Sequence, residues 1–436
     1  MKKVIWWAVF ASLQGLDALE IVIDRGNDNP IPIAVVPFAS SNSTGDISGV
    51  ISFDLIRSGQ FSPIEKENML SYPSQPEDVY FRDWRILGME YLLIGRHLSR
   101  VDGGITVTYR LFDVSAEREV KSGEITAPRD RMRDIAHRIA DDVYEEITGI
   151  RGAFSTRILY VLVENIGTSY ARYKLEMADS DGERPRTLFE TSEPLLSPSW
   201  SPDGQRIAYV SFETGRPSIV IQELESNVRQ RLPSYPGLNG APAFSPDGRE
   251  LAMVLSRDGN PEIYTMEIAT PARRPRRVTR HVSAIDTEPG WTPDGKSLIF
   301  TSDRGGRPQI YRVDLRTSLT ERLTYHGDYN ARARLLPDGR HLVYVHRREG
   351  IYHIAWQDLE TDEGPRVLTK TSLDESPSLA PNGTMLIYAT QDQGRGILAV
   401  VSIDGQVKYK LPSSAGDVRE PSWSPYLDTL SATRGL

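Results

Sequence analysis

The chain has 436 residues, a formal net charge of −8, and 39% hydrophobic and 25% charged residues. This length is enough for two or three domains with cores of their own. The Lys and Arg residues are scattered, which argues against nucleic acid as a partner, because surfaces that bind it carry a basic stripe. The chain contains no cysteine, so disulfides, thiolate metal sites and a cysteine nucleophile are excluded.

Residues 1–18 have the pattern of a secretory signal peptide. Lys2 and Lys3 precede a short apolar run, Val4 to Leu13, and Ala18 offers a small residue for cleavage. A buried N-terminal strand or a membrane anchor is the alternative interpretation. No later apolar run approaches the roughly 20 residues of a membrane span. We therefore expect a soluble mature protein in the bacterial periplasm.

Residues 19–150 alternate strand and helix patterns and predict a mixed α/β domain. The clearest helix begins at Met132, because apolar residues recur from there at three- and four-residue intervals and form one stripe. Gly149 stands where a C′ glycine would end that helix. Helical periodicity disappears after residues 151–156, which we interpret as a linker.

The remainder of the chain repeats variants of one signature, a Pro-x-Trp/Phe/Leu triplet followed by a Pro-Asp-Gly turn. Pro presets φ near −65°, Asp can bond its own backbone, and Gly accepts a positive φ. The copies recur at intervals of 44, 47, 44, 44 and 44 residues, which is typical of propeller blades. Each repeat also contains four successive strand-like runs, the content of one blade. The second prolines of the copies are Pro202, Pro246, Pro293, Pro337, Pro381 and Pro425.

The repeats predict a six-bladed β-propeller over residues 157–427. The first strands of this region lack a signature of their own, whereas the last signature has only the tail 428–436 after it. We therefore expect residues 421–424 to pair with residues 157–163 as the inner strand of the first blade, which leaves no open edge. The expected fold class is thus a two-domain chain, α+β and then all-β, closed by a C-terminal strand.

The chain lacks the motifs of common catalytic and metal sites. There is no G-x-S-x-G elbow, which hydrolases associated with similar propellers require, and no G-x-G-x-x-G or Walker-type loop. None of the seven histidines forms H-x-H or H-E-x-x-H. We therefore expect no catalytic residue, no metal site and no cofactor.

The repeated aspartates could suggest calcium binding or acid–base chemistry, but their uniform place in Pro-Asp-Gly turns favours a structural role. The repeated aromatic residues are expected to pack between blades. These two sets are Asp203, Asp247, Asp294 and Asp338, and Trp200, Phe244, Trp291 and Trp423.

The segments just before each inner strand are a better functional candidate. They connect an outer strand with the next inner strand, so in a propeller they gather on one face around the mouth of the channel. A constant framework with varying loops on one face is how a binding surface is made. A peptidase-associated or carbohydrate-binding propeller is the alternative. The first would need a nucleophile motif, and the second would need exposed aromatic residues beyond Tyr235 and Tyr329.

Several stretches resemble the TolB family of the Tol–Pal envelope system. They are IVIDRGNDNPIPIAVVPF, SPSWSPDGQRIAYVSFETGR, NGAPAFSPDG, TSDRGGRPQIY, LDESPSLAPNGTMLIY and the ending PSWSPYL. The resemblance covers essentially the whole mature chain. It implies a periplasmic, non-enzymatic monomer that binds the lipoprotein Pal through one propeller face and TolA through its extended N-terminus. It also implies a role in outer-membrane integrity and in constriction during division, with colicin translocation segments able to occupy the Pal site.

The resemblance places the Pal site in the loops before the inner strands. Relatives often carry histidine where this chain has Leu238, so apolar packing rather than a polar contact is expected at that point. The expected Pal-binding residues are Leu238, Asn239, Gly240, Ala241, Pro242, Asp286, Thr287, Glu288, Asp374, Glu375, Arg419 and Glu420.

The resemblance places the TolA-binding segment at residues 19–29. An ordinary edge strand packed on its own domain is the alternative, and a segment that alternates between docked and released states, with Pal controlling its release, would reconcile both. The residues expected to bind TolA are Leu19, Glu20, Ile21, Val22, Ile23 and Asp24.

Overall fold

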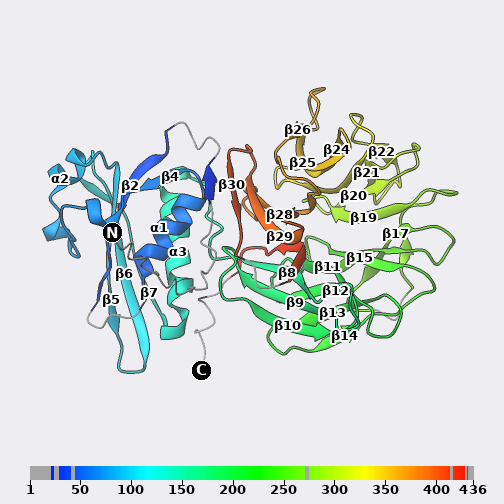
Figure 1. Cartoon of the computed structure of the whole chain (residues 1–436), viewed down its shortest axis with the longest axis horizontal. Coiled ribbons are helices and arrows are strands. Elements are labelled where there is room, and N and C mark those ends of the chain that lie inside the picture. The colour runs from blue at the N-terminus through cyan, green and yellow to red at the C-terminus, as the bar shows by residue number, and fades with distance from the viewer. Residues whose placement is uncertain are drawn as a thin grey trace, which may run out of the picture.

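The structure is a computed structural model that describes residues 21–23, 29–40, 45–270, 274–412, 416–427 and 430. An α/β domain lies beside a β-propeller (Figure 1). None of the helices in these ranges is both long and apolar enough to span a membrane. The predicted signal peptide, residues 1–18, lies outside the described residues.

The N-terminal domain is built on a mixed sheet with strand order β4-β2-β5-β6-β7, in which β3 also pairs with β5. The pairs of β2 with β4 and β5 are parallel, and the pairs β5–β6 and β6–β7 are antiparallel. The elements are β2 (Ile31–Val35), β3 (Ala39–Ser40), α1 (Ile47–Arg57), β4 (Phe61–Pro63), η1 (Lys66–Asn68), η2 (Pro76–Asp78), α2 (Phe81–Ile86), β5 (Tyr91–Ser99), β6 (Gly104–Asp113), β7 (Arg118–Pro128), η3 (Arg129–Arg131) and α3 (Met132–Thr148).

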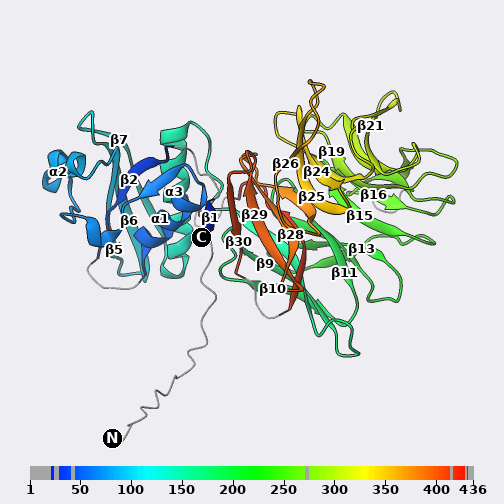
Figure 2. The same cartoon turned by 45° about the horizontal axis from the view of Figure 1, so that its top comes forward.

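Helices α1 and α3 lie between this sheet and the propeller (Figure 2). The predicted apolar stripe of α3 packs into the same core as Leu93 and Val107 of the sheet, which confirms the periodicity of that segment. Gly149 ends α3 with a φ of +74°, the left-handed conformation expected of a C′ glycine. The N-terminus of α1 is capped by Asp46, whose Oδ1 accepts a hydrogen bond of 2.8 Å from the backbone N–H of Gly49.

The propeller has six blades, as predicted. The sheets, each written from the inner strand outward, are β31-β8-β9-β10, β11-β12-β13-β14, β15-β16-β17-β18, β19-β20-β21-β22, β23-β24-β25-β26 and β27-β28-β29-β30. Every pairing within these sheets is antiparallel.

The first blade contains β8 (Arg157–Glu164), β9 (Arg172–Asp179), β10 (Arg186–Thr191) and β31 (Asp417–Trp423). The second contains β11 (Leu195–Trp200), β12 (Arg206–Ser211), β13 (Ser218–Glu223) and β14 (Arg229–Arg231). The third contains β15 (Asn239–Phe244), β16 (Glu250–Leu255), β17 (Glu262–Glu267) and β18 (Arg276–Arg277).

The fourth blade contains β19 (Asp286–Trp291), β20 (Ser297–Ser302), β21 (Gln309–Asp314) and β22 (Thr320–Arg322). The fifth contains β23 (Asn330–Leu335), β24 (His341–Arg348), β25 (Ile351–Asp358) and β26 (Arg366–Val367). The sixth contains β27 (Glu375–Leu379), β28 (Met385–Asp392), β29 (Arg395–Ser402) and β30 (Val407–Lys410).

The ring closes as predicted, because β31 from the C-terminal end pairs with β8, with Ser422 opposite Leu159 and Trp423 opposite Ile158. The repeated tryptophans join neighbouring parts of the ring. The indole N–H of Trp200 donates to the carbonyl of Ser422 at 3.0 Å, and that of Trp291 donates to the carbonyl of Ala243 at 3.0 Å.

Strand β1 (Ile21–Ile23) adds a fifth strand to the sixth blade. It pairs antiparallel with β30, with Val22 opposite Lys408. The alternative that this segment packs as an edge strand on its own domain is therefore wrong. The outer edge of β30 provides unpaired backbone groups, and β1 satisfies them across the domain boundary.

Candidate functional site

The loops between outer and inner strands meet at one mouth of the propeller channel, and buried polar side chains hold four of them in place. These side chains occupy one repeat position at the start of the inner strands, Asn239, Asp286, Asn330 and Asp374, and all four are buried. The remaining two blades have buried Leu195 and Val418 at this position.

The bonds of these side chains show how they shape the loops. Asn239 accepts from the backbone N–H of Tyr235 at 2.8 Å and donates to the carbonyls of Tyr235 and Gly237 at 2.7 and 3.1 Å. Asp374 accepts from the hydroxyls of Thr371 and Thr390, each at 2.7 Å. A buried carboxylate or amide with its partners satisfied fixes the loop around it.

Each inner strand contains a β-bulge two residues after the repeat position that these buried side chains occupy. The register shifts at this point in all six blades. One residue per blade has a φ between +46° and +57°, which is unfavourable for residues other than glycine. Bulges of this kind redirect a side chain. We call these six residues the mouth ring: Ser197, Ala241, Glu288, Arg332, Ser376 and Glu420.

The charged members of the mouth ring connect adjacent blades. Arg332 donates from Nε to Oε1 of Glu288 at 2.7 Å and also contacts the hydroxyl of Ser376 in the next blade. The second oxygen of Glu288 accepts from the backbone N–H of Arg332 at 3.1 Å, and the carboxylate of Glu420 likewise accepts from the backbone N–H of Ser197. Burial raises the pKa of Glu420, and the nearby Arg332 acts in the opposite direction.

A cavity of about 440 Å³ opens among these loops, lined in part by Glu288, Arg332 and Arg419. Five large apolar side chains in or next to the loops are exposed, and Val282 is 97% accessible. An apolar side chain that is exposed beside a polar cavity is suited to burial against a partner. The five are Leu196, Leu238, Val282, Ile285 and Leu373.

The residues that the resemblance assigned to Pal binding divide into two groups. Asn239, Gly240, Pro242, Asp286 and Asp374 are buried, so they shape the loops rather than present their side chains. The half-buried or exposed residues are Leu238, Ala241, Thr287, Glu288, Glu375, Arg419 and Glu420.

Sequence reasoning missed Ser197, Arg332, Ser376 and Asn330. Their constant offset within the repeat was the signal that could have identified them. Of the residues assigned to TolA binding, Ile21–Ile23 form β1, whereas Leu19, Glu20 and Asp24 lie outside the described residues.

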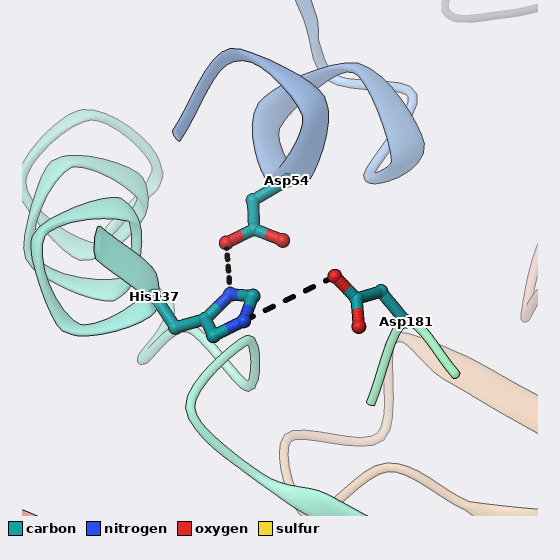
Figure 3. A group of neighbouring side chains, drawn as sticks. All are labelled: Asp54, His137 and Asp181. Atoms are coloured by element: carbon teal, nitrogen blue, oxygen red, sulfur yellow. Dashed lines mark hydrogen bonds and ion pairs between the residues drawn. The ribbon is translucent and has the colours of Figure 1, made fainter. Parts of the chain in front are cut away.

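A second polar cluster is buried where the two domains meet (Figure 3). His137 of α3 donates from Nδ1 to Asp54 of α1 at 2.6 Å, and its Nε2 lies 3.5 Å from Asp179 and 3.9 Å from Asp181 of the propeller. Arg57 of α1 contacts Asp54 at 3.0 Å and donates to the hydroxyl of Ser180 at 2.8 Å. The two domains are thus joined by charged pairs that exclude water.

Asp54, His137 and Asp181 each bring one ligand atom within 4.8 Å of the others, a spacing that could hold a metal ion. However, the carboxylates already accept from cations of the chain. Asp54 accepts from Arg57 and His137, and Asp181 contacts Arg133. The geometry therefore fits a network of salt bridges in which the protonated His137 takes the place of a metal cation.

This network predicts that stability falls at alkaline pH. Burial acts to lower the pKa of His137, but the neighbouring carboxylates of Asp54 and Asp179 outweigh it and raise the pKa from 6.5 to about 9. A raised pKa in the folded state means that the stabilisation is complete below pH 6.5 and is lost as the pH rises through about 9. Urea denaturation on both sides of this window should show the loss, and His137→Gln should reduce it. An equal pH dependence in the variant would contradict the assignment.

The fold and the loops define a two-domain β-propeller protein whose non-repeating residues gather at one channel mouth. Family models described as "TolB beta propeller domain" and "TolB amino-terminal domain" match residues 144–427 and 19–120. The Tol-Pal system protein TolB of Pseudomonas aeruginosa is 51% identical over 412 residues, which cover 94% of each chain. The crystal structure of TolB from Acinetobacter baumannii has a TM-score of 0.85 and 42% identity, covering 94% of this chain and 100% of that one. The chain belongs to the TolB family.

Proposed function

We propose that the chain is a periplasmic scaffold of the Tol–Pal system that binds Pal through the loops at the channel mouth and TolA through residues 19–29. It acts without catalysis and supports outer-membrane integrity and constriction during cell division. The observation that carries the proposal is the arrangement of the loops: buried side chains fix their backbones, exposed apolar side chains stand in or next to them, and charged side chains line one cavity. The similarity to proteins named Tol-Pal system protein TolB supports the choice of system.

The proposed contact surface consists of the exposed and half-buried residues of the loops. Leu238, Val282 and Leu373 supply apolar area, and Glu288, Glu375 and Arg419 supply charge around the cavity. Such a surface suits a folded protein with apolar anchors and a polar rim. Colicin translocation segments would compete for the same surface.

Replacing Thr287 with tryptophan is expected to weaken Pal binding by about tenfold or more, because a large side chain at a packed interface prevents close approach. Isothermal titration calorimetry with purified Pal measures the change. Lys296→Trp is the matched control, since Lys296 is exposed beyond the other end of the same inner strand. The affinity of this variant for Pal should stay unchanged. Equal affinities for Thr287→Trp and the control would contradict the site.

The N-terminal segment is proposed to bind TolA after leaving the sixth blade. Strand β1 pairs with β30 over three residues, so its release exposes only a short edge. β30 (Val407–Lys410) is followed in the chain by β31 (Asp417–Trp423), which contains Arg419 and Glu420. This connection offers a route by which Pal at the channel mouth controls whether β1 is docked.

Removing residues 19–29 from the mature chain is expected to abolish TolA binding and to leave Pal affinity unchanged, because β1 pairs with the outer strand β30 and not with an inner strand at the channel mouth. A pull-down with purified TolA, paired with calorimetry on Pal, measures both effects. Retention of TolA by the shortened chain would overturn the assignment of this segment.

A further inference from the structure

A second ring of residues lines the channel two positions after the mouth ring in each inner strand. We call it the inner ring: Ser199, Ala243, Gly290, Arg334, Ser378 and Ser422. These residues line a cavity of about 390 Å³. The inner ring contains one arginine and no acidic residue, while Glu288, Arg332 and Glu420 of the mouth ring also line this cavity.

The guanidinium of Arg334 has no carboxylate partner in the part of the chain that the structure describes. Its one hydrogen bond runs from a terminal nitrogen to the carbonyl of Ala333 at 2.8 Å. Both oxygens of Glu288, an acid of the mouth ring whose charge acts on Arg334, are already engaged by Arg332 and Thr301. A guanidinium has five N–H donors, so most of those of Arg334, which lines the cavity, have no protein acceptor among the described residues.

The serines of the inner ring are further hydrogen-bond donors beside Arg334. Arg334 lies in the fifth blade, and Ser378, Ser422 and Ser199 lie in the sixth, first and second blades, which follow one another around the ring. Within the described ranges, the hydroxyls of Ser199 and Ser422 have no protein hydrogen-bond partner. The hydroxyl of Ser378 accepts from the backbone N–H of Trp423 at 2.8 Å and keeps its own proton to donate. The other two blades contribute only Ala243 and Gly290.

An unpaired, partly buried cation is unfavourable unless a counter-ion or water compensates it. Burial lowers the pKa of Arg334; the charge of Glu288 acts to raise it, and that of Arg332 acts to lower it. An anion in the cavity would add to the effect of Glu288 and stabilise the charged guanidinium. Four acceptor oxygens on a tetrahedral anion would match one guanidinium and three hydroxyls more fully than the two oxygens of a carboxylate.

We propose that Arg334 and the three serines of the inner ring form a binding site for one small tetrahedral oxyanion, such as inorganic phosphate or sulfate, inside the propeller channel. Arg334 provides the charge, and Ser199, Ser378 and Ser422 orient the anion by donating hydrogen bonds. The site requires neither Pal nor TolA, so it does not rest on the proposed function.

The test is titration of the purified mature chain with inorganic phosphate at constant ionic strength. Binding is followed by calorimetry and by tryptophan fluorescence, because Trp200, Trp291 and Trp423 line the same cavity. Arg334→Gln should weaken phosphate binding by about tenfold or more, since a charged hydrogen-bonding partner is lost. Arg249→Gln, at an exposed arginine of a turn, is the matched control and should bind phosphate as the unchanged chain does.

The combined variant Ser199→Ala and Ser422→Ala keeps the charge and tests the hydroxyls if Arg334→Gln fails to fold. It should weaken phosphate binding by roughly threefold to tenfold, as expected for loss of neutral hydrogen bonds. The proposal is overturned if the unchanged chain binds neither phosphate nor sulfate, or if Arg334→Gln binds phosphate equally well. It is also overturned if acetate binds as tightly as phosphate and the serine variant has no effect, because the site would then select carboxylates.

Discussion

Replacing Asp54 with alanine is expected to lower the free energy of unfolding by about 3–5 kcal/mol, because it leaves buried cations without their partner. Asp54 accepts from His137 at 2.6 Å and from Arg57 at 3.0 Å, and all three side chains are almost completely buried. Burial acts to raise the pKa of Asp54, but His137 and Arg57 hold it below its usual range. The carboxylate is therefore charged in the folded protein, and its loss leaves His137 and Arg57, which reach Asp179 and Ser180 of the propeller, without their partner in α1.

The measurement is urea denaturation with fluorescence and circular dichroism followed together, since the chain has two domains that can unfold separately. Asp102→Ala is the matched control, because Asp102 pairs with Arg100 on the surface and its removal should leave the transition unchanged. A double variant that replaces both Asp54 and His137 with leucine should recover part of the lost stability, since it removes both charges. An unchanged transition for Asp54→Ala would show that the network does not hold the domains together.

The propeller could be predicted from the sequence because its repeated turn is determined by local chemistry. Asp203 accepts from the backbone N–H of Gln205 at 3.0 Å and from the hydroxyl of Ser201, and Gly204 has the positive φ that the turn requires. Every residue needed for this turn lies within a few positions of the next. The spacing of the copies therefore indicated both the number of blades and the strand that closes the ring.

The contacts between the domains could not be predicted in this way. Arg57 and Ser180 are 123 positions apart, and no periodic pattern connects two such residues. The docking of β1 on the sixth blade could not be predicted for the same reason, since its partner strand begins at Val407, near the other end of the chain. From sequence alone, an aspartate in a helix is predicted to face solvent, and only the structure shows which element covers it.

The connections between outer and inner strands could be located along the chain from the repeat, but the structural roles of their residues were only partly predictable. Asn239 and Asp374 were assigned to partner contact, and the structure buries both beneath the loops. A polar residue in a loop can hold the backbone or face a partner, and its type alone does not distinguish the two. The mouth ring depends on a left-handed backbone at non-glycine residues such as Arg332, which residue type does not indicate.

Ending the chain at Gly416 is expected to have the largest effect of any change considered, because it removes β31 and opens the ring. β8 would then expose an inner edge that is now paired. The structure would also lose the bond from the indole N–H of Trp423 to the hydroxyl of Thr156, at 2.8 Å, and the bond from the backbone N–H of Arg157 to the hydroxyl of Ser424, at 2.9 Å. We expect aggregation in size-exclusion chromatography and no cooperative thermal transition.

Ending the chain at Leu430 is the control, because it keeps β31 and Leu430, which packs against the core of the N-terminal domain. This control should remain monomeric and melt as the full chain does. If the chain that ends at Gly416 cannot be isolated, Trp423→Ala gives a graded measurement, with an expected loss of about 3–5 kcal/mol for removing a large buried side chain. A monomeric, cooperatively melting chain without β31 would mean that five complete blades and one three-stranded blade suffice. Closure by the C-terminal strand would then not be what keeps the propeller folded.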